Sequence, residues 1–266
     1  MGGTRRRWGG GLRAAAGLVL PVRCAGCGAP GEGWCPRCRH EARRPAGGLT
    51  VGAGVPPCWS ATPLVGPVRR AVSAHKDGGR RDLHPVLVDL LAAALARALA
   101  EDPVLRAAVA AGGPVLVVPV PETRSAARRR GEDPVGRLAG AAVGRLDDPG
   151  VALVPVLRHT RRVADQSRLG RSERAANLAG ALGVAGRGAE RVVGAACVVV
   201  DDVVTTGATL GEAARALRAA GAAHVVAATV AATPGAPPGR PRLHEEGDPA
   251  DGPGSAVGVV RVRSDG

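Results

Sequence analysis

The stretch that decides the fold is Cys197-Val198-Val199-Val200-Asp201-Asp202-Val203-Val204-Thr205-Thr206-Gly207-Ala208-Thr209. It opens with an apolar run, places two adjacent acids where that run ends, and leads through small residues into a helical pattern at 209–220. An apolar run of this kind predicts a central strand that is buried on both faces. In open α/β sheets ligands bind at the carboxyl ends of such strands. We therefore predict an α/β domain with a site where this strand ends.

Apolar runs alternate with helical patterns on both sides of this stretch. The expected strands cover residues 59–65, 115–120, 152–157, 196–200 and 224–229, and the expected helices cover 68–74, 84–100, 135–146, 172–182 and 209–220. Strands that are apolar throughout and alternate with helices indicate a parallel sheet flanked by helices. The predicted fold class is therefore α/β, with a small cysteine-rich module ahead of the sheet.

Composition divides the chain into four parts. We expect an N-terminal segment at 1–20, a cysteine module at 21–50, an α/β domain at 58–233 and a disordered tail at 234–266, which is rich in Pro, Gly, Asp and Arg. The N-terminal segment superficially resembles a signal peptide, but Gly9–Gly11 and Arg13 interrupt it, and no cleavage site follows. Because no run of 18 apolar residues exists, we expect a cytoplasmic protein without a membrane span.

The small residues Thr205, Thr206, Gly207, Ala208 and Thr209 form a loop that leads into a helix. Backbone N–H groups, hydroxyls and a helix N-terminus can together hold a phosphate monoester. Asp201 and Asp202 point to different sides of the strand end, so that one can reach a ribose diol or its metal and the other the reaction centre. In the simpler reading, both acids are ordinary turn and capping residues. The restrictive order of acids and small residues favours the phosphate site.

Four cysteines lie within fifteen residues, as two Cys-x-x-Cys pairs that seven residues separate: Cys24, Cys27, Cys35 and Cys38. Two such pairs can complete a tetrahedral Zn²⁺ site, and four ligands leave no open position, so the ion would be structural. Two disulfides or a redox pair are the alternatives, and the disulfides are disfavoured if the chain stays in a reducing compartment. Cys58 and Cys197 lie outside this pattern, and we expect both to be small core residues.

The net charge of +13 indicates anionic partners, either small phosphates or a nucleic acid. Only one of the 36 basic residues is a lysine, Lys76, so a compositional preference for arginine accounts for part of this charge. The chain has no Phe or Tyr and only three Trp, so an aromatic platform for single strands is not apparent. The charge therefore leaves both kinds of partner open.

The stretch Cys197–Thr209 resembles, at every position, the signature of the type I phosphoribosyltransferases. The resemblance implies that Asp201 and Asp202 contact the ribose hydroxyls and serve catalysis, and that the loop holds the 5′-phosphate together with Val203 and Val204. It also implies that Mg²⁺ accompanies phosphoribosyl pyrophosphate, whose pyrophosphate is displaced from C1 through a cationic transition state. Negative charge near C1 would stabilise that state.

A cysteine module ahead of such a domain resembles the ComF family of competence-associated proteins. Further segments carry the likeness: Val118-Pro119-Val120-Pro121 followed by Arg128-Arg129-Arg130, the arginine-rich stretch 161–177, and the stretch around Lys76. Arg128, Arg129 and Arg130 suit a pyrophosphate, although a solvated basic helix face would look the same.

The resemblance leaves three functions open. The chain could be a phosphoribosyltransferase with an unknown acceptor, or a non-catalytic accessory protein of competence that senses a phosphoribosyl ligand. It could also bind single-stranded DNA or competence-machinery proteins through its zinc module and arginine surface. The oligomeric state is open as well.

Overall fold

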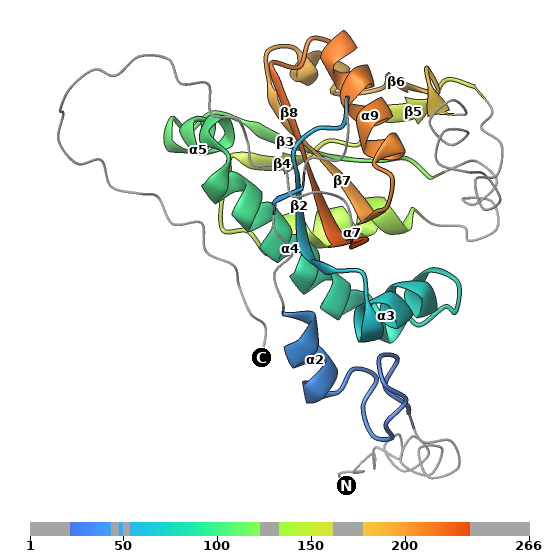
Figure 1. The fold of residues 1–266 in the computed structure, drawn as a ribbon. Coiled ribbons are helices and arrows are strands. Elements are labelled where there is room, and N and C mark those ends of the chain that lie inside the picture. Colours follow the sequence, from blue (N-terminus) through green and yellow to red (C-terminus); the bar gives the residue numbers. More distant parts are fainter. Residues whose placement is uncertain (1–21, 44–47, 50–53, 123–132, 162–177, 235–266) are drawn as a thin grey trace, which may run out of the picture.

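The computed structural model describes residues 22–43, 48–49, 54–122, 133–161 and 178–234 of the 266-residue chain (Figure 1). In chain order the elements are α2 (Pro36–Ala42), β1 (Gly48–Leu49), β2 (Cys58–Pro63), α3 (Gly66–Lys76), the 3₁₀ turn η1 (Arg81–Leu83), α4 (His84–Glu101), α5 (Pro103–Ala110), β3 (Val115–Pro119), α7 (Pro134–Val143), β4 (Val151–Leu153), β5 (Leu157–His159), β6 (Leu182–Val184), the 3₁₀ turn η2 (Ala189–Val192), β7 (Ala196–Val204), α9 (Ala208–Ala219) and β8 (His224–Ala232). The N-terminal segment 1–20, the loop that holds Arg128 to Arg130, and the tail from residue 235 lie outside the described residues.

The main sheet has the strand order β1-β2-β8-β7-β3-β4. Every neighbouring pair from β2 to β4 is parallel, and only β1 joins antiparallel, at the edge beside β2. All five residues of β3 and the first five of β7 are buried, as the apolar runs predicted. The predicted parallel sheet flanked by helices is therefore confirmed, and β7 and β8 lie at its centre.

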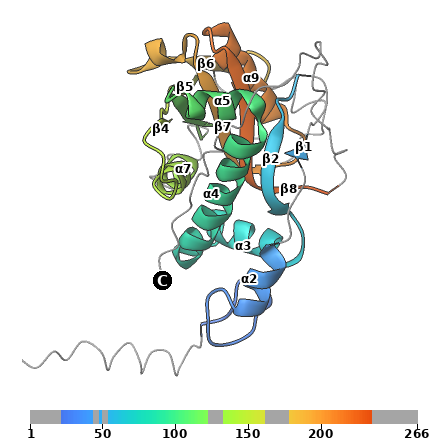
Figure 2. The same cartoon turned by 90° about the vertical axis from the view of Figure 1, so that its left-hand side faces the viewer.

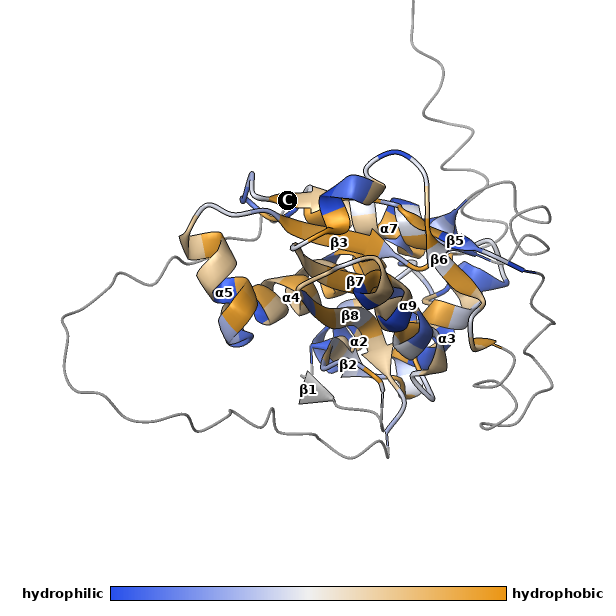
Figure 3. Cartoon of the chain, turned by 90° about the horizontal axis from the view of Figure 1, so that it is seen from above, coloured by the Kyte–Doolittle hydropathy of each residue, from blue (hydrophilic) through white to orange (hydrophobic). Residues whose placement is uncertain are grey.

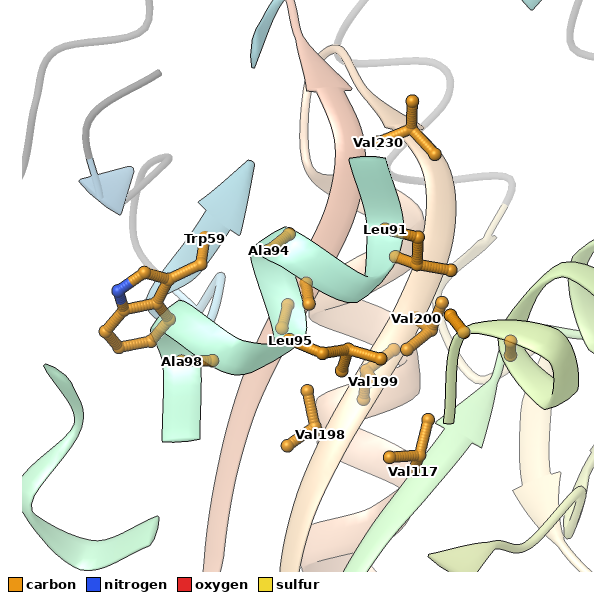
Figure 4. Close-up of a cluster of buried hydrophobic side chains, with 14 of the residues drawn as sticks. Trp59, Leu91, Ala94, Leu95, Ala98, Val117, Val198, Val199, Val200 and Val230 are labelled. Carbon is orange, nitrogen blue, oxygen red and sulfur yellow. The ribbon is translucent and has the colours of Figure 1, made fainter. Parts of the chain in front are cut away.

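Helices cover both faces of the sheet, with α4 and α9 on opposite sides (Figure 1). In the close-up of the core, Leu91 and Leu95 of α4 point at the valines of β7, and Trp59 of β2 lies beside the end of α4 (Figure 4). Viewed from above, β3 and the first part of β7 are hydrophobic, whereas α9 is hydrophilic on its outer side (Figure 3). This arrangement buries apolar side chains on both faces of the central strands, which is the main stabilising term of such a fold.

Helix α4 is rich in Ala and Leu, which have high helix propensity, and Pro85 lies in its first turn, where a missing N–H costs nothing. Residues 81–101 are the single stretch of the described chain that is long and apolar enough, by length and composition, to cross a membrane. Half of that stretch is buried within the fold, and α4 packs on β2 and β8. A core helix passes the same test, so α4 is weak support for a membrane span.

Two predictions near the second, smaller sheet are wrong. Residues 152–157 were expected to form one strand, but β4 ends at Leu153 and β5 begins at Leu157, because Pro155 cannot donate to a sheet ladder. The helix expected at 172–182 does not reach its predicted end: within the described part of that range only Leu178 is helical, and Leu182 begins β6. Gly180, at φ +67°, breaks the helical path between these two residues.

Strands β5 and β6 pair antiparallel, and β6 is attached to α9 by an ion pair in which the carboxylate is buried and the arginine is half exposed. Glu212 of α9 accepts a hydrogen bond from the N–H of Leu182 at 2.9 Å, and Arg215 donates to Glu212 at 2.8 Å and to the carbonyl of Leu182 at 2.9 Å. Burial alone would raise the pKa of Glu212, but the bonds from Arg215 and Leu182 outweigh it and hold that pKa below its usual value.

Candidate functional site

The candidate site lies where β7 ends and the chain turns into α9. Asp201 and Asp202 are residues six and seven of this nine-residue strand, and Asp201 lies opposite Thr229 of β8 in the sheet register. Because side chains alternate across a strand, the two acids face opposite sides of the sheet. Asp201 lines a small hollow on the side of the β7–α9 loop, whereas Asp202 lines a larger cavity next to α3, α4 and α7. The predicted divergence of the two acids is therefore present.

The loop after the acids surrounds the small hollow, which measures about 50 Å³. Its lining consists of Asp201 and of the residues from Val203 to Leu210, including Val204, Thr205, Thr206, Ala208 and Thr209. Gly207 adopts φ +78°, a left-handed conformation that favours glycine, and α9 begins at the next residue. The hydroxyl of Thr206 accepts a 3.4 Å bond from the N–H of Ala208, while no side chain caps α9. The first residues of α9, whose backbone N–H groups lack intrahelical acceptors, thus line the hollow, as an anion site requires.

The two acids differ in their electrostatics. Burial of its carboxyl, and then the negative charge of Asp202, raises the pKa of Asp201 well above the usual range of an aspartate. Asp201 accepts a 2.8 Å bond from the backbone N–H of Asp202. Two carboxylates at one strand end repel each other, so hydroxyl donors or a cation would relieve that repulsion on binding.

Lys76 at the end of α3 reaches this site from a distant part of the chain. Its Nζ lies 3.1 Å from Oδ2 of Asp202, with 46% of the lysine side chain and 19% of the aspartate side chain exposed. The stretch around Lys76 carried part of the ComF resemblance, but no spacing in the sequence indicates this pair, because 126 residues separate the two. The contact places a cation beside the acid that faces the larger cavity.

The four cysteines of the N-terminal module lie together, ahead of and within the first turn of α2. All four sulfur atoms lie within 4.8 Å of one another, and Sγ of Cys27 is 3.6 Å from Sγ of Cys35. A tetrahedral zinc with bonds of about 2.3 Å would hold its sulfur ligands about 3.8 Å apart. The cluster therefore fits the predicted structural zinc module, whereas Cys58 and Cys197 are buried core residues, also as predicted.

The cysteines of this cluster have perturbed pKa values. Burial alone would raise the pKa of Cys24, but hydrogen bonds from backbone N–H groups outweigh it and lower that pKa to about 6. One of these bonds comes from the N–H of Cys35, at 3.4 Å. Burial and the neighbouring thiols raise the pKa of Cys38. A metal ligand is a thiolate, so a bound zinc would offset the repulsion among these sulfur atoms.

The cysteine module packs against α3 in both views of the molecule (Figures 1 and 2). Arg70 of α3 donates from Nε to the carbonyl of Gly26, and Arg80 donates to the carbonyl of Arg23 at 3.3 Å. A Cβ atom on Gly26 would lie 2.7 Å from Cβ of Pro67, so only glycine permits this approach. Helix α3 therefore contacts the cysteine module through its first half and Asp202 at its end.

Residues 136–245 match the family model of the phosphoribosyl transferase domain. The matched region contains the end of β7, both acids and the loop into α9. No curated protein matches the chain. The family match, the parallel sheet and the loop all indicate the same class of protein. The chain carries a phosphoribosyltransferase domain, and this supports a binding site for a phosphoribosyl ligand. Arg128, Arg129 and Arg130 lie outside the described residues, so their contribution to this site remains a prediction.

Proposed function

We propose that this chain binds phosphoribosyl pyrophosphate, or a related ribose phosphate, together with Mg²⁺ at the end of β7. The observation that supports the proposal most is the hollow that Asp201 and the loop 203–210 line at the start of α9. A hollow of this composition provides N–H and hydroxyl donors for a phosphate next to a carboxylate acceptor for a ribose hydroxyl.

Each group of the site then has a separate task. The loop from Thr205 to Thr209 holds the 5′-phosphate, and Asp201 and Asp202 accept hydrogen bonds from the ribose hydroxyls. When bound, Mg²⁺ neutralises charge on the pyrophosphate. Both carboxylates also stabilise the positive charge that develops on the ribose as the bond between C1 and the pyrophosphate oxygen breaks. Arg128 to Arg130 would bind the departing pyrophosphate.

We further propose that the protein is a cytoplasmic relative of the ComF family that transfers the phosphoribosyl group to an acceptor. The clustered cysteines ahead of a phosphoribosyltransferase domain support this, because they combine the two parts on which the resemblance rests. Zinc in the cluster would have a structural task, since four thiolates leave no position for a substrate.

Calorimetric titration of the protein with phosphoribosyl pyrophosphate and Mg²⁺ tests the ligand. We expect binding that weakens by at least about tenfold when Asp201→Asn and Asp202→Asn are combined, because two charge-assisted hydrogen bonds are lost. Asp89→Asn, on the exposed side of α4, is the matched control and should bind like the parent protein. Unchanged binding in the double variant would refute the site.

Pyrophosphate release over a panel of amines and heterocyclic bases then distinguishes an enzyme from a sensor. Release with any member identifies a transferase. Binding without release for every acceptor would favour the second candidate, an accessory protein of competence that uses the site to sense its ligand.

That second candidate includes contact with single-stranded DNA or with competence proteins, and a net charge of +13 is compatible with a polyanionic partner. If several arginines neutralise DNA phosphates, the logarithm of the affinity should fall against the logarithm of salt with a slope of about 0.7 per phosphate. Filter binding at several salt concentrations measures this slope. A flat response would remove DNA as a partner.

A further inference from the structure

A cavity of about 470 Å³ adjoins the candidate site on the side that Asp202 faces. Small-molecule sites commonly enclose about 300–1,000 Å³. The floor is aliphatic and comes from four elements: Val72 of α3, Leu87 of α4, Val135 and Leu138 of α7, and Val230 of β8. All five of these side chains are buried. The cavity therefore has the size and the floor of a site for a small organic molecule.

The rim of the cavity is charged and carries more cations than anions. Lys76, Arg81 and Arg137 line it, together with Asp77 and Asp202. Within this rim, Lys76 forms an ion pair with Asp202. Burial lowers the pKa of both His75 and His84, and the positive charge of Arg137 lowers these two pKa values further. The rim therefore favours a ligand that carries negative charge.

The lining contains no amide or hydroxyl side chain among the residues described for it. Neutral heterocycles are usually distinguished by amide, hydroxyl or backbone groups that pair with their edges. Among the described lining residues the one aromatic ring is that of His75, which stacks on His84 with ring centres 5.8 Å apart. The described side chains of the lining thus offer a ligand apolar contact and charge.

We propose that this cavity is the acceptor site of the transferase and that its occupant is a small organic anion with a compact apolar body, such as an aromatic carboxylate. The inference rests on the proposed function, because it assigns the second substrate of the same reaction. Asp201 and the loop would hold the 5′-phosphate on one side of β7, and the acceptor would lie on the other, where Asp202 ends the cavity.

The reaction balances with an amine as the nucleophile. The lone pair of the amine nitrogen forms a bond to C1 of the ribose. The bond from C1 to the pyrophosphate oxygen breaks, and its electron pair leaves with the pyrophosphate. The amine then releases one proton to solvent at the open rim.

The probe is 4-aminobenzoate, with 4-aminobenzamide as its neutral counterpart, and both are titrated by calorimetry into the protein. We expect the carboxylate to bind about tenfold more tightly than the amide, because Arg137 and its neighbours offer charge-assisted hydrogen bonds. Arg137→Gln should remove that advantage. Arg218→Gln, exposed in the last turn of α9, is the matched control and should retain it.

A second variant tests the floor. Val135→Phe should fill part of the cavity and weaken both probes about equally, since it removes space rather than charge. If Val135→Phe does not fold, Arg137→Gln still decides, because Arg137 is exposed. Equal affinity for the two probes, no binding by either, or an unchanged Arg137→Gln variant would overturn the acceptor assignment.

Binding of phosphoribosyl pyrophosphate, measured in the same preparations, separates this inference from the proposed function. If phosphoribosyl pyrophosphate binds and 4-aminobenzoate does not, only the acceptor assignment fails. If 4-aminobenzoate binds and phosphoribosyl pyrophosphate does not, the cavity holds an anion but the proposed function fails, and with it the role of that anion as acceptor.

Discussion

The ionised carboxyl of Asp201 lowers the stability of the ligand-free protein. This carboxyl is desolvated and lies beside Asp202, and both effects raise its pKa. A group whose pKa is raised in the folded state binds protons more tightly there than in the unfolded chain. The stability it contributes is therefore lost as the pH rises from the unfolded pKa through the folded one. Such a cost at a functional position is common, because binding and stability select for different side chains.

Asp201→Asn should therefore stabilise the ligand-free protein at neutral pH while it weakens ligand binding. Each 1 kcal/mol gained would raise the melting temperature by about 2–4 °C in a chain of this size. The gain should grow as the pH is raised from about 4, where an unfolded aspartate begins to ionise. Thermal denaturation over pH 4–8 measures it.

Asp202→Asn provides the comparison for this prediction. It removes the partner of Lys76, whose side chain is half exposed, so it should change stability by no more than about 1 kcal/mol. A lower melting temperature for Asp201→Asn than for the parent at every pH would contradict the view that the acid pair is strained.

At the scale of elements, the sequence predicted the parallel strands well and the connections between them poorly. Buried strands such as β3 and β7 are continuous apolar runs, so their position can be predicted from local pattern alone. Residues 152–157 form a continuous apolar run as well, yet Pro155 divides them between two sheets. Glu212 of α9 holds the start of β6 through the N–H of Leu182, and no local pattern indicates this contact.

Glu212→Gln should destabilise the protein by about 1–3 kcal/mol at pH 7, because a neutral amide replaces the buried carboxylate that accepts charge-assisted hydrogen bonds from Arg215. The pKa of Glu212 is lowered by folding, so its contribution is present above the unfolded pKa and is lost as the pH falls through the folded value. The difference from the parent should accordingly shrink below about pH 4.

Urea denaturation at pH 7 and at about pH 3 tests this expectation. Glu190→Gln, in the exposed turn η2, is the control and should have little effect at either pH. If Glu212→Gln lowers the free energy of unfolding by the same amount at both pH values, the small sheet is held by the packing of the side chain and not by its charge.

At the scale of the whole molecule, the cysteine module and the candidate site share α3. The sequence predicted both sites separately, since each depends on a local motif. It did not predict their connection, because Arg70 and Lys76 meet Gly26 and Asp202 only after the chain has folded. The larger cavity could not be predicted either, since its lining comes from α3, α4, α7, β7 and β8.

Purified protein should contain one zinc per chain, and Cys27→Ser should remove it, because three thiolates bind zinc much more weakly than four. Loss of zinc should lower the melting temperature by several degrees and increase proteolysis around α3. Metal analysis and limited proteolysis measure both effects. Cys197→Ala, a buried residue outside the cluster, should retain the metal. Zinc-free protein with all four cysteines reduced would contradict the assignment.

The strand order has a consequence for how the chain is made. The first long strand, β2, pairs with β8, and the two most central strands, β7 and β8, follow all the other described strands in the chain. β3 lacks its neighbour β7 until residue 204 has left the ribosome, and β2 lacks β8 until residue 232 has done so, so their edges stay open to wrong partners until then. The cysteine module and α3, which lie close together in the chain, can form early, whereas the sheet closes only after β8 has emerged. The ligand site, built on the end of β7, therefore forms later than the cysteine module.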